Sequence, residues 1–199
     1  MKLIENHIFH VYNRGNDRQP IFFSRENYLF FLRKIRTHLL PTCDLLTYCL
    51  MPNHFHLLVK ADARTVAIVN PENILRPIQA FSRGLQTMLS SYARAIQKQE
   101  NLVGSLFQQH TEAKQVSSEL YLEDYTLFCF RYILYNPADA RLVTNPIDWE
   151  FSSCRDLAGL RNGTLCNKKI IQNELGLEWN KLEGLVSKPL TYEERKLIL

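Results

Sequence analysis

Two histidines, His54 and His56, stand two positions apart in an otherwise apolar segment of the chain. Side chains alternate between the two faces of a β-strand, so both imidazoles would point to one face and Phe55 to the other. Two neutral imidazoles side by side can hold one divalent metal ion. A bare His-x-His pattern also fits two polar residues on the solvent side of a half-buried strand. The pair therefore indicates a metal site only together with other residues.

A second set of reactive side chains lies near residues 120–137, a region with four tyrosines: Tyr121, Tyr125, Tyr132 and Tyr135. Tyr132 and Asn136 are four residues apart, so they would share one face of a helix. A tyrosine hydroxyl can act as a nucleophile, and an amide oxygen is a suitable ligand for a hard cation. Asn136 also has a plain structural interpretation, because it precedes Pro137 at the expected end of the helix.

The two histidines are expected to lie in a β-hairpin. Residues 45–50 form one apolar run, Pro52 and Asn53 give a turn signal, and residues 54–59 form a second run. Residues 6–13 alternate in character and predict another strand, which ends at a glycine-containing turn. Residues 104–116 predict a further short extended stretch.

Helices are predicted where apolar residues recur at spacings of three and four. Ser24 is the expected N-cap of a helix that reaches Leu39, and residues 78–99 repeat the same spacing. Residues 120–135 predict a third helix, which the Asn-Pro step is expected to stop.

The rest of the chain is less regular. Residues 61–77 contain two prolines, which limit any helix there. Residues 150–199 predict short helices and loops, and Thr191 and Glu194 have the spacing of a capping box for a last helix.

The predicted order of elements is strand, helix, strand, strand, helix, strand, helix. This order favours an α+β fold in which a ferredoxin-like antiparallel sheet carries helices on one face, followed by a C-terminal helical and irregular extension. The 199 residues suffice for one core with an appendage, since domains most often hold roughly 100–150 residues.

The composition limits the class of protein. Apolar residues make up 46% and charged residues 22% of the chain, which is typical of a soluble globular protein. A transmembrane helix is not expected, because no run of about 18 apolar residues occurs, and the start of the chain does not resemble a secretory signal. The five cysteines are scattered and form no C-x-x-C pair, which predicts free thiols in a reducing cytoplasm. The net charge of +4 is compatible with a phosphate-rich partner.

The residues around the histidine pair resemble a known family. Residues 50–59 (LMPNHFHLLV) resemble the signature of HUH endonucleases, and the likeness is closest to single-tyrosine transposases of small insertion sequences and their REP-associated relatives. Other segments agree in order and spacing: residues 10–18 with Ile21 and Phe22, residues 104–108 (GSLFQ), residues 132–137 (YILYNP) and residues 149–153 (WEFSS). The resemblance covers roughly residues 6–155, which suggests a catalytic domain at residues 1–155 and an extension of unknown role at residues 156–199.

The resemblance implies a specific chemistry. The family places its nucleophile five residues before the proline of the Asn-Pro step, which selects Tyr132. His54, His56 and Asn136 would then hold Mg²⁺ or Mn²⁺ at the scissile phosphate of single-stranded DNA. Attack by Tyr132 would leave a 5′-phosphotyrosine link and a free 3′-OH. DNA hairpins are the expected ligands, and a homodimer is expected because relatives commonly dimerise.

Candidate DNA contacts follow from residue type. The basic side chains expected to meet phosphates are Arg14, Arg18, Arg83, Arg94 and Lys114. Tyr12 could stack on bases. Gln108 and His110 are expected near the site, although residues 109–112 (QHTE) depart from the arginine and tyrosine that relatives often carry there.

Two other functions stay open at this level. A domesticated DNA-binding protein could keep the fold without cutting DNA, although the complete set of four site residues argues against it. An unrelated metallohydrolase could use the two histidines with carboxylates, for which Asp44 is the only nearby candidate in sequence.

Overall fold

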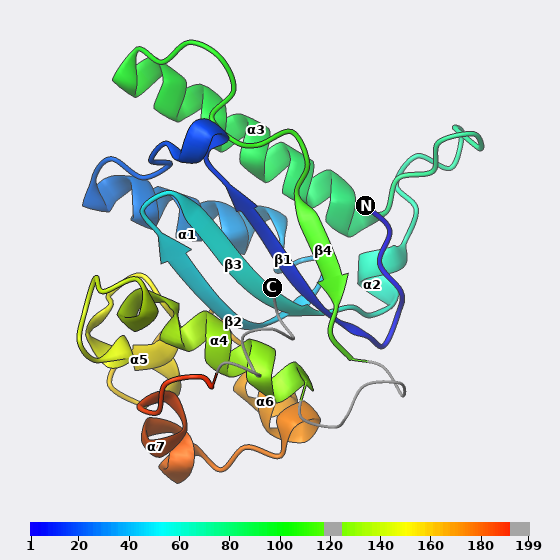
Figure 1. Cartoon of the computed structure of the whole chain (residues 1–199). Helices are drawn as coiled ribbons and strands as arrows, with labels where there is room; N and C mark the ends of the chain where they lie inside the picture. The colour runs from blue at the N-terminus through cyan, green and yellow to red at the C-terminus, as the bar shows by residue number, and fades with distance from the viewer. Residues whose placement is uncertain (118–124, 192–199) are drawn as a thin grey trace.

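The computed structural model describes residues 1–117 and 125–191, and Figure 1 shows how their elements are arranged. Its core elements, in chain order, are β1 (Ile8–Arg14), α1 (Arg25–His38), β2 (Asp44–Met51), β3 (His54–Lys60), α3 (Ala80–Glu100), β4 (Glu112–Gln115) and α4 (Tyr125–Asp139). The strands form one antiparallel sheet in the order β2-β3-β1-β4. This order, with α1 and α3 as the two crossover helices, is the ferredoxin-like arrangement that the sequence predicted.

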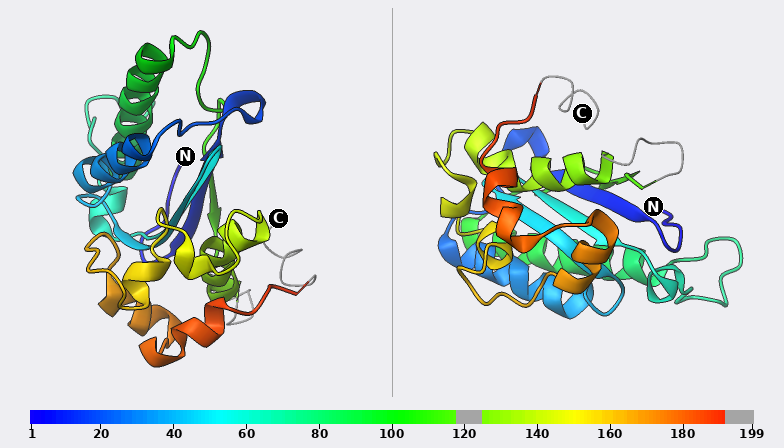
Figure 2. Two further views of the ribbon diagram at one scale, coloured as in Figure 1. Left: turned by 90° about the vertical axis from the view of Figure 1, so that its left-hand side faces the viewer. Right: turned by 90° about the horizontal axis from the view of Figure 1, so that it is seen from below.

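Helices α1 and α3 pack together on one face of the sheet, as Figure 2 (left) shows edge-on. Alternate residues of the central strands point toward them, and Val11, Phe55 and Leu57 are fully buried there. Phe31 of α1 and Tyr92 of α3 meet these side chains from the helix side. Burial of each side chain of this size stabilises the fold by about 1.5–3 kcal/mol, so this layer holds β1 and β3 firmly in register.

The predicted cap of the first helix is present. Ser24 precedes α1 and forms a capping box with Asn27, whose side-chain oxygen accepts a hydrogen bond from the Ser24 N–H at 3.2 Å. This box satisfies backbone donors that the first turn of a helix leaves without partners. The helix therefore begins where the sequence predicted.

Helix α4 covers the opposite face of the sheet, so the molecule has a further layer beyond the expected helices on one face (Figure 2). The physical reason lies in the strands, which are apolar on both faces. Seven of the eight residues of β2 are buried, and Leu46, Cys49 and Leu58 point away from α1 and α3. Ile133 and Leu134 of α4 pack against this second apolar face.

The prediction that the Asn136-Pro137 step stops this helix was wrong. Helix α4 continues through Pro137 to Asp139, and the Ala140 N–H still donates to the Asn136 carbonyl oxygen at 2.9 Å. A proline removes one backbone N–H, and so close to the helix end the buried packing of Ile133 outweighs that loss. The first residues of the predicted helix, 120–124 with Tyr121, lie outside the described residues.

The C-terminal region supports both α4 and the sheet. Its short elements are η2 (Pro146–Asp148), α5 (Cys154–Leu157), α6 (Lys168–Leu175), η3 (Trp179–Lys181) and α7 (Leu182–Val186), as the sequence predicted. Ile171 and Leu182 complete the core beneath α4, and Arg131 of α4 donates from Nε to the Leu185 carbonyl oxygen at 3.3 Å. Of the capping box predicted at Thr191 and Glu194, the second residue lies outside the described part of the chain.

The same region closes the outer edge of β2. The Leu50 N–H donates to the Phe151 carbonyl oxygen at 2.9 Å, and the Asn167 N–H donates to the Leu45 carbonyl oxygen at 2.8 Å. Unpaired strand edges favour intermolecular pairing, so these bonds remove one such edge.

Two connecting segments differ in detail from the expectation. Residues 61–77 contain one turn of helix, α2 (Ala63–Val66), which the Asp62 side chain caps. In residues 104–116 the extended pairing is confined to β4 and to a single bridge between Gly15 and Phe107.

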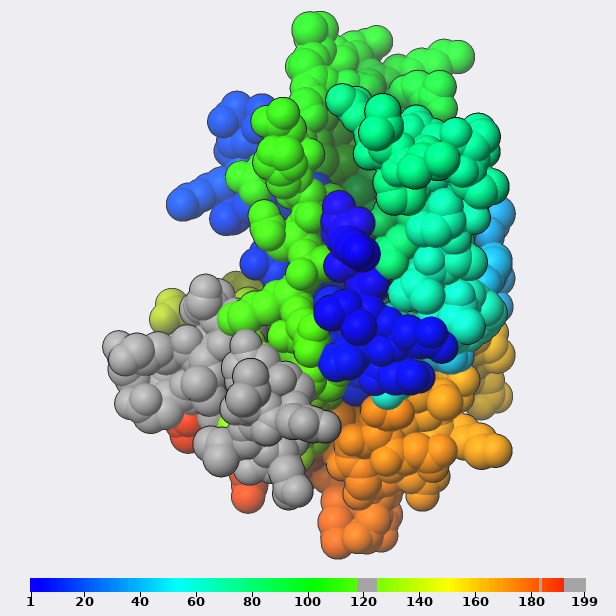
Figure 3. Space-filling model, turned by 90° about the vertical axis from the view of Figure 1, so that its right-hand side faces the viewer, coloured from blue at the N-terminus to red at the C-terminus, as the bar shows by residue number. Residues whose placement is uncertain are grey.

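The N-terminal residues lie between the β4 segment and residues 61–80 (Figure 3). The Gln79 side chain accepts a hydrogen bond from the Leu3 N–H and donates one to the Leu3 carbonyl oxygen. Within the described residues, no helix combines the length and apolar character needed to span a membrane.

Gly84 of α3 marks a close approach of α3 to the end of α1. A Cβ built on Gly84 would lie 2.3 Å from the carbonyl oxygen of His38, and backbone atoms cannot give way as a flexible side chain can. We expect Gly84→Ala to lower the free energy of unfolding by about 1–3 kcal/mol, because the two helices must separate. Urea denaturation measures this change.

The matched control is Gly184→Ala in α7, where a Cβ would meet nothing within 4 Å. This control should leave the free energy of unfolding unchanged or slightly higher, because alanine favours the helix. Equal effects at the two positions would contradict the close helix approach.

Candidate active site

The site forms on the face of the sheet that α4 covers. Strands β1 and β3 are antiparallel neighbours, with Tyr12 opposite His56 and Arg14 opposite His54. Directly opposed residues of an antiparallel pair share one face, so these four side chains point the same way, as does His10 two residues before Tyr12. They line a cavity of about 310 Å³ together with Tyr132 of α4.

Hydrogen bonds fix the orientation of both histidines in the predicted metal-binding pair. His56 Nδ1 lies 2.8 Å from His10 Nε2, and His54 Nδ1 lies 2.7 Å from Asn53 Oδ1. The His54 and His56 ring centroids are 4.9 Å apart, with the ring planes nearly perpendicular. Because the short contacts are made by Nδ1 of each ring, Nε2 is the nitrogen that would meet a metal ion; on His56 this nitrogen faces Asn136.

Helix α4 brings the other two predicted residues to the same place. Asn136 is buried, and its Nδ2 lies 3.4 Å from His56 Nε2. Tyr132, one turn earlier, approaches His56 edge-on with the ring centroids 5.5 Å apart. The structure therefore brings the four residues together within one chain: His54, His56 and Tyr132 line the cavity, and the buried Asn136 lies against His56.

Burial makes the imidazoles neutral. It lowers the pKa of His54 to about 4, although a hydrogen bond with Asn136 acts in the opposite direction. It lowers the pKa of His56 well below the ordinary histidine value, and neighbouring His10 adds to this effect. Burial raises the pKa of Tyr132, and its hydrogen bond with Asn136 partly offsets the rise. Neutral imidazole is the form that binds metal ions.

The donor set fits a divalent cation. The two imidazole rings lie side by side and the Asn136 side chain contacts one of them through Nδ2; with its Oδ1 turned to the ion, this set would give the mixed nitrogen and oxygen ligands that suit Mn²⁺ and Mg²⁺. In residues 1–117 and 125–191, no cluster of three or more His, Cys, Asp or Glu side chains is suited to a metal ion. Asp44, the carboxylate that a metallohydrolase would need, lies opposite Lys60 at the far end of β3 and pairs with Arg64.

The predicted DNA-binding residues divide between the two faces of the sheet. Tyr12 and Arg14 line the histidine cavity. Lys114 of β4 lies opposite His10 and 5.6 Å from the Tyr125 ring centroid. Arg18 is exposed in the turn after β1. By contrast, the exposed residues Arg83 and Arg94 belong to α3, on the other side of the sheet, so the six candidates do not form one surface.

Arg14 is the most suggestive of these residues. Among the residues that the structure describes, its Nε is one of two buried side-chain nitrogen or oxygen atoms without a hydrogen-bond partner. A buried donor without a partner is costly, and a guanidinium group readily binds phosphate. Arg14 thus offers an anion contact directly beside His54.

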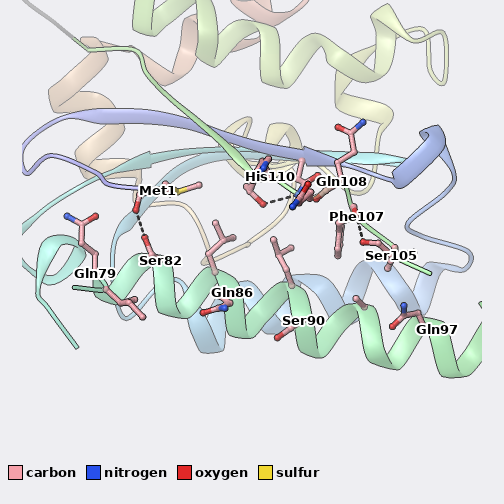
Figure 4. Close-up of a pocket in the computed structure, with 18 of the residues that line it drawn as sticks. Met1, Gln79, Ser82, Gln86, Ser90, Gln97, Ser105, Phe107, Gln108 and His110 are labelled. Atoms are coloured by element: carbon pink, nitrogen blue, oxygen red, sulfur yellow. Dashed lines mark hydrogen bonds between the residues drawn. The ribbon is translucent and has the colours of Figure 1, made fainter. Parts of the chain in front are cut away.

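A second cavity, of about 620 Å³, lies between α3 and residues 105–111 (Figure 4). Gln86, Ser90 and Gln97 of α3 are among its lining residues, and Gln108 and His110 line it from the opposite segment. Its lining contains no Lys, Arg, Asp or Glu side chain. Three residues line both cavities: Asn13, Gln108 and His110.

Two residues of the site have no predicted role. His10 belongs to one of the motifs that carry the resemblance, and its spacing from Tyr12 places it on the same strand face. Glu112, which also lines the histidine cavity, falls in the segment that departs from the family pattern. The pairing of β1 with β4, which places Glu112 opposite Tyr12, could not be read from the sequence.

The architecture, with a histidine pair on β3 that faces a tyrosine-bearing helix, is shared with a protein of known structure. The solved structure described as a REP-associated tyrosine transposase bound to a REP hairpin is similar to this chain, with a TM-score of 0.55. The match covers 84% of this chain and 92% of that chain, at 16% sequence identity, which establishes the fold alone. No protein-family model and no curated protein matches the sequence. The likeness confirms the predicted fold resemblance.

The geometry predicts a metal-binding defect for His54→Ala. Loss of a residue that merely supports a ligand weakens metal affinity about 10–100-fold, so loss of a ligand should weaken Mn²⁺ affinity by about 100-fold or more. Titration of Mn²⁺ followed by electron paramagnetic resonance measures the affinity. His7→Ala, which removes a half-buried histidine whose Nδ1 lies 2.9 Å from the Glu5 carbonyl oxygen, is the control and should bind as the unaltered protein does. Equal affinity for the two variants would contradict this ligand set.

Proposed function

We propose that this protein is a metal-dependent enzyme that nicks single-stranded DNA and transfers the strand through a covalent tyrosine link. The observation that carries the proposal is the position of Tyr132, which faces the neutral His54 and His56 across the cavity while Asn136 contacts His56. A nucleophile and a set of metal ligands on opposing walls of one cavity are what such a reaction needs.

The proposed reaction exchanges one phosphodiester for another. The Tyr132 oxygen attacks the phosphorus and loses its proton, and the bond from phosphorus to the 3′ oxygen breaks. The 3′ oxygen takes up a proton and leaves as a free 3′-OH, while the 5′ phosphate stays on Tyr132. A later 3′-OH attacks the same phosphorus in the reverse sense, so the step needs no oxidant and no ATP.

The chain's own residues prepare this reaction. His54, His56 and Asn136 would hold the Mg²⁺ or Mn²⁺ ion, which supplies charge to polarise the scissile phosphate. Arg14, with its buried Nε directed to no protein acceptor among the described residues, would bind a phosphate oxygen. Helix α4 keeps Tyr132 and Asn136 one turn apart, so the nucleophile stays next to the ligands.

The proposed substrate is single-stranded DNA next to a hairpin. The similar solved structure is described as bound to a REP hairpin, and the two cavities of this chain suit a strand without a partner. The larger cavity has amide and hydroxyl groups over an apolar floor and no cationic side chain, which suits bases more than phosphates. It meets the histidine cavity at Asn13, Gln108 and His110. We therefore propose that bases lie in the larger cavity while the scissile phosphate lies at the histidines.

The cavity is built from one chain, so the proposed reaction can use Tyr132 and the histidines of the same subunit. Dimerisation, which the family resemblance implies, stays a prediction.

The covalent intermediate gives the direct test. Hairpin-containing single-stranded DNA labelled at its 3′ end is incubated with the protein and Mn²⁺, and an adduct that resists SDS is separated by electrophoresis. We expect a labelled adduct with the unaltered protein, none with Tyr132→Phe, and an undiminished amount with the control Tyr135→Phe on the same helix. A strand labelled at its 5′ end should instead be released without protein. An adduct that persists in Tyr132→Phe would refute the assignment, whereas binding without any adduct across varied hairpins would favour the non-cutting DNA-binding protein.

Arg14 gives a second test that needs no cleavage. We expect Arg14→Gln to weaken binding of single-stranded DNA and to reduce the slope of log affinity against log salt by about 0.7, the contribution of one phosphate contact. Fluorescence anisotropy at several salt concentrations measures both quantities. Arg33→Gln on α1, across the sheet, is the control and should leave the slope unchanged. An unchanged slope in Arg14→Gln would exclude the phosphate contact.

A further inference from the structure

His10 is a buried polar residue that the proposed reaction does not use. It lies on β1 with 3% of its surface exposed, and its Nε2 is 2.8 Å from Nδ1 of His56, which is itself 6% exposed. Ile8, the preceding residue on the same face of β1, is an ordinary core residue. An imidazole therefore replaces an apolar side chain at the point where the strand reaches the cavity.

We propose that His10 is a positioning residue that holds the ring of His56 in place and keeps its proton on Nδ1. The inference rests on the proposed function only insofar as His56 is taken to be a metal ligand. The hydrogen bond itself, and the proton position that it selects, exist without metal or DNA.

The direction of this hydrogen bond follows from what lies on the other side of His56. A neutral imidazole carries one proton, so one nitrogen donates and the other accepts. Asn136 Nδ2, a donor, lies 3.4 Å from His56 Nε2. His56 Nε2 must then be the acceptor, and the proton sits on Nδ1, from which it is donated to His10 Nε2. The opposite assignment would set two N–H groups against each other at Asn136.

This proton position is the one that metal binding requires. Only a nitrogen without a proton can donate a lone pair to a metal ion, so His56 can bind through Nε2 only while Nδ1 carries the proton. Acceptors behind ligating histidines commonly fix both the proton and the ring orientation in this way. His10 plays for His56 the part that Asn53 Oδ1, 2.7 Å from Nδ1 of the ring, plays for His54.

The surroundings of His10 hold it in place. The Tyr12 ring lies beside it with the centroids 4.7 Å apart, and the His56 ring stacks at 5.0 Å. The Tyr132 ring meets it edge-on at 6.2 Å, and Lys114 stands opposite on β4. With neighbours on these sides, His10 can transmit its own fixed position to His56.

The proton position can be read directly by long-range ¹H–¹⁵N correlation spectra of the protein labelled at histidine, without metal or DNA. We expect His56 to carry its proton on Nδ1 in the unaltered protein. His10→Leu should move part of the His56 population to a proton on Nε2, because only the 3.4 Å contact with Asn136 then favours Nδ1, whereas His10→Gln should keep the proton on Nδ1, because its side-chain oxygen can accept the same hydrogen bond. A proton on Nε2 in the unaltered protein would overturn the proposal, even if a variant failed to fold.

Mn²⁺ affinity provides the second readout. We expect His10→Leu to bind Mn²⁺ about 10–100-fold more weakly, the usual effect of losing a residue that supports a ligand, and His10→Gln to stay within about fivefold of the unaltered protein. His7→Leu is the control for loss of a histidine elsewhere. A loss below about fivefold in His10→Leu, or an equal loss in both His10 variants, would overturn the proposal. A protein that has the expected proton position but forms no DNA adduct would refute the proposed function and leave the role of His10 intact.

Discussion

The antiparallel pairing of β1 with β3 is the interaction on which the histidine cavity depends. It sets Tyr12 opposite His56 and Arg14 opposite His54, so one face of two central strands carries the reactive side chains. The other face of the same strands is apolar and packs against α1 and α3. A shift by one residue in either strand would bury the histidines among Phe31 and its neighbours. The core and the site thus specify the same register, and neither can change without the other.

The second requirement is burial of the histidine side chains. Helix α4 and the C-terminal helices bury the histidine face, which makes charged imidazoles unfavourable and leaves lone pairs available to a metal ion. The same burial disfavours the tyrosinate form of Tyr132. Under the proposed reaction, burial would therefore act on both the metal ligands and the nucleophile, and the oxygen of Tyr132 would become reactive only when positive charge enters the cavity.

The sequence alone predicted the parts that follow short-range rules. The hairpin around Pro52, the cap at Ser24 and the two long crossover helices depend on neighbours in the chain, and all three are present. The convergence of Tyr132 and Asn136 on the histidine pair was predicted from helical spacing and from the family resemblance, and the fold brings these residues together.

The remainder depended on contacts between distant segments. The helix continued past Pro137 because buried packing outweighed the lost hydrogen bond, and no local pattern reports such packing. The partner of His56, His10, is 46 residues away, and only the register of two strands makes them neighbours. Arg83 and Arg94 were grouped with Arg14 by charge alone, but the sheet separates them from it. Side-chain type indicated which residues could contact DNA, but it could not predict which face of the sheet each of them occupies.

Helix α4 is fastened on both sides, by the sheet above and by the C-terminal segment below, where Arg131 reaches the Leu185 carbonyl. Tyr132 therefore lies on a helix that is packed on two sides. Under the proposed reaction, the DNA would move between the two transfer steps while helix α4 stays in place. The incoming 3′ end would have to reach the phosphotyrosine, so strand exchange would depend on how freely the DNA can turn and not on a movement of the helix.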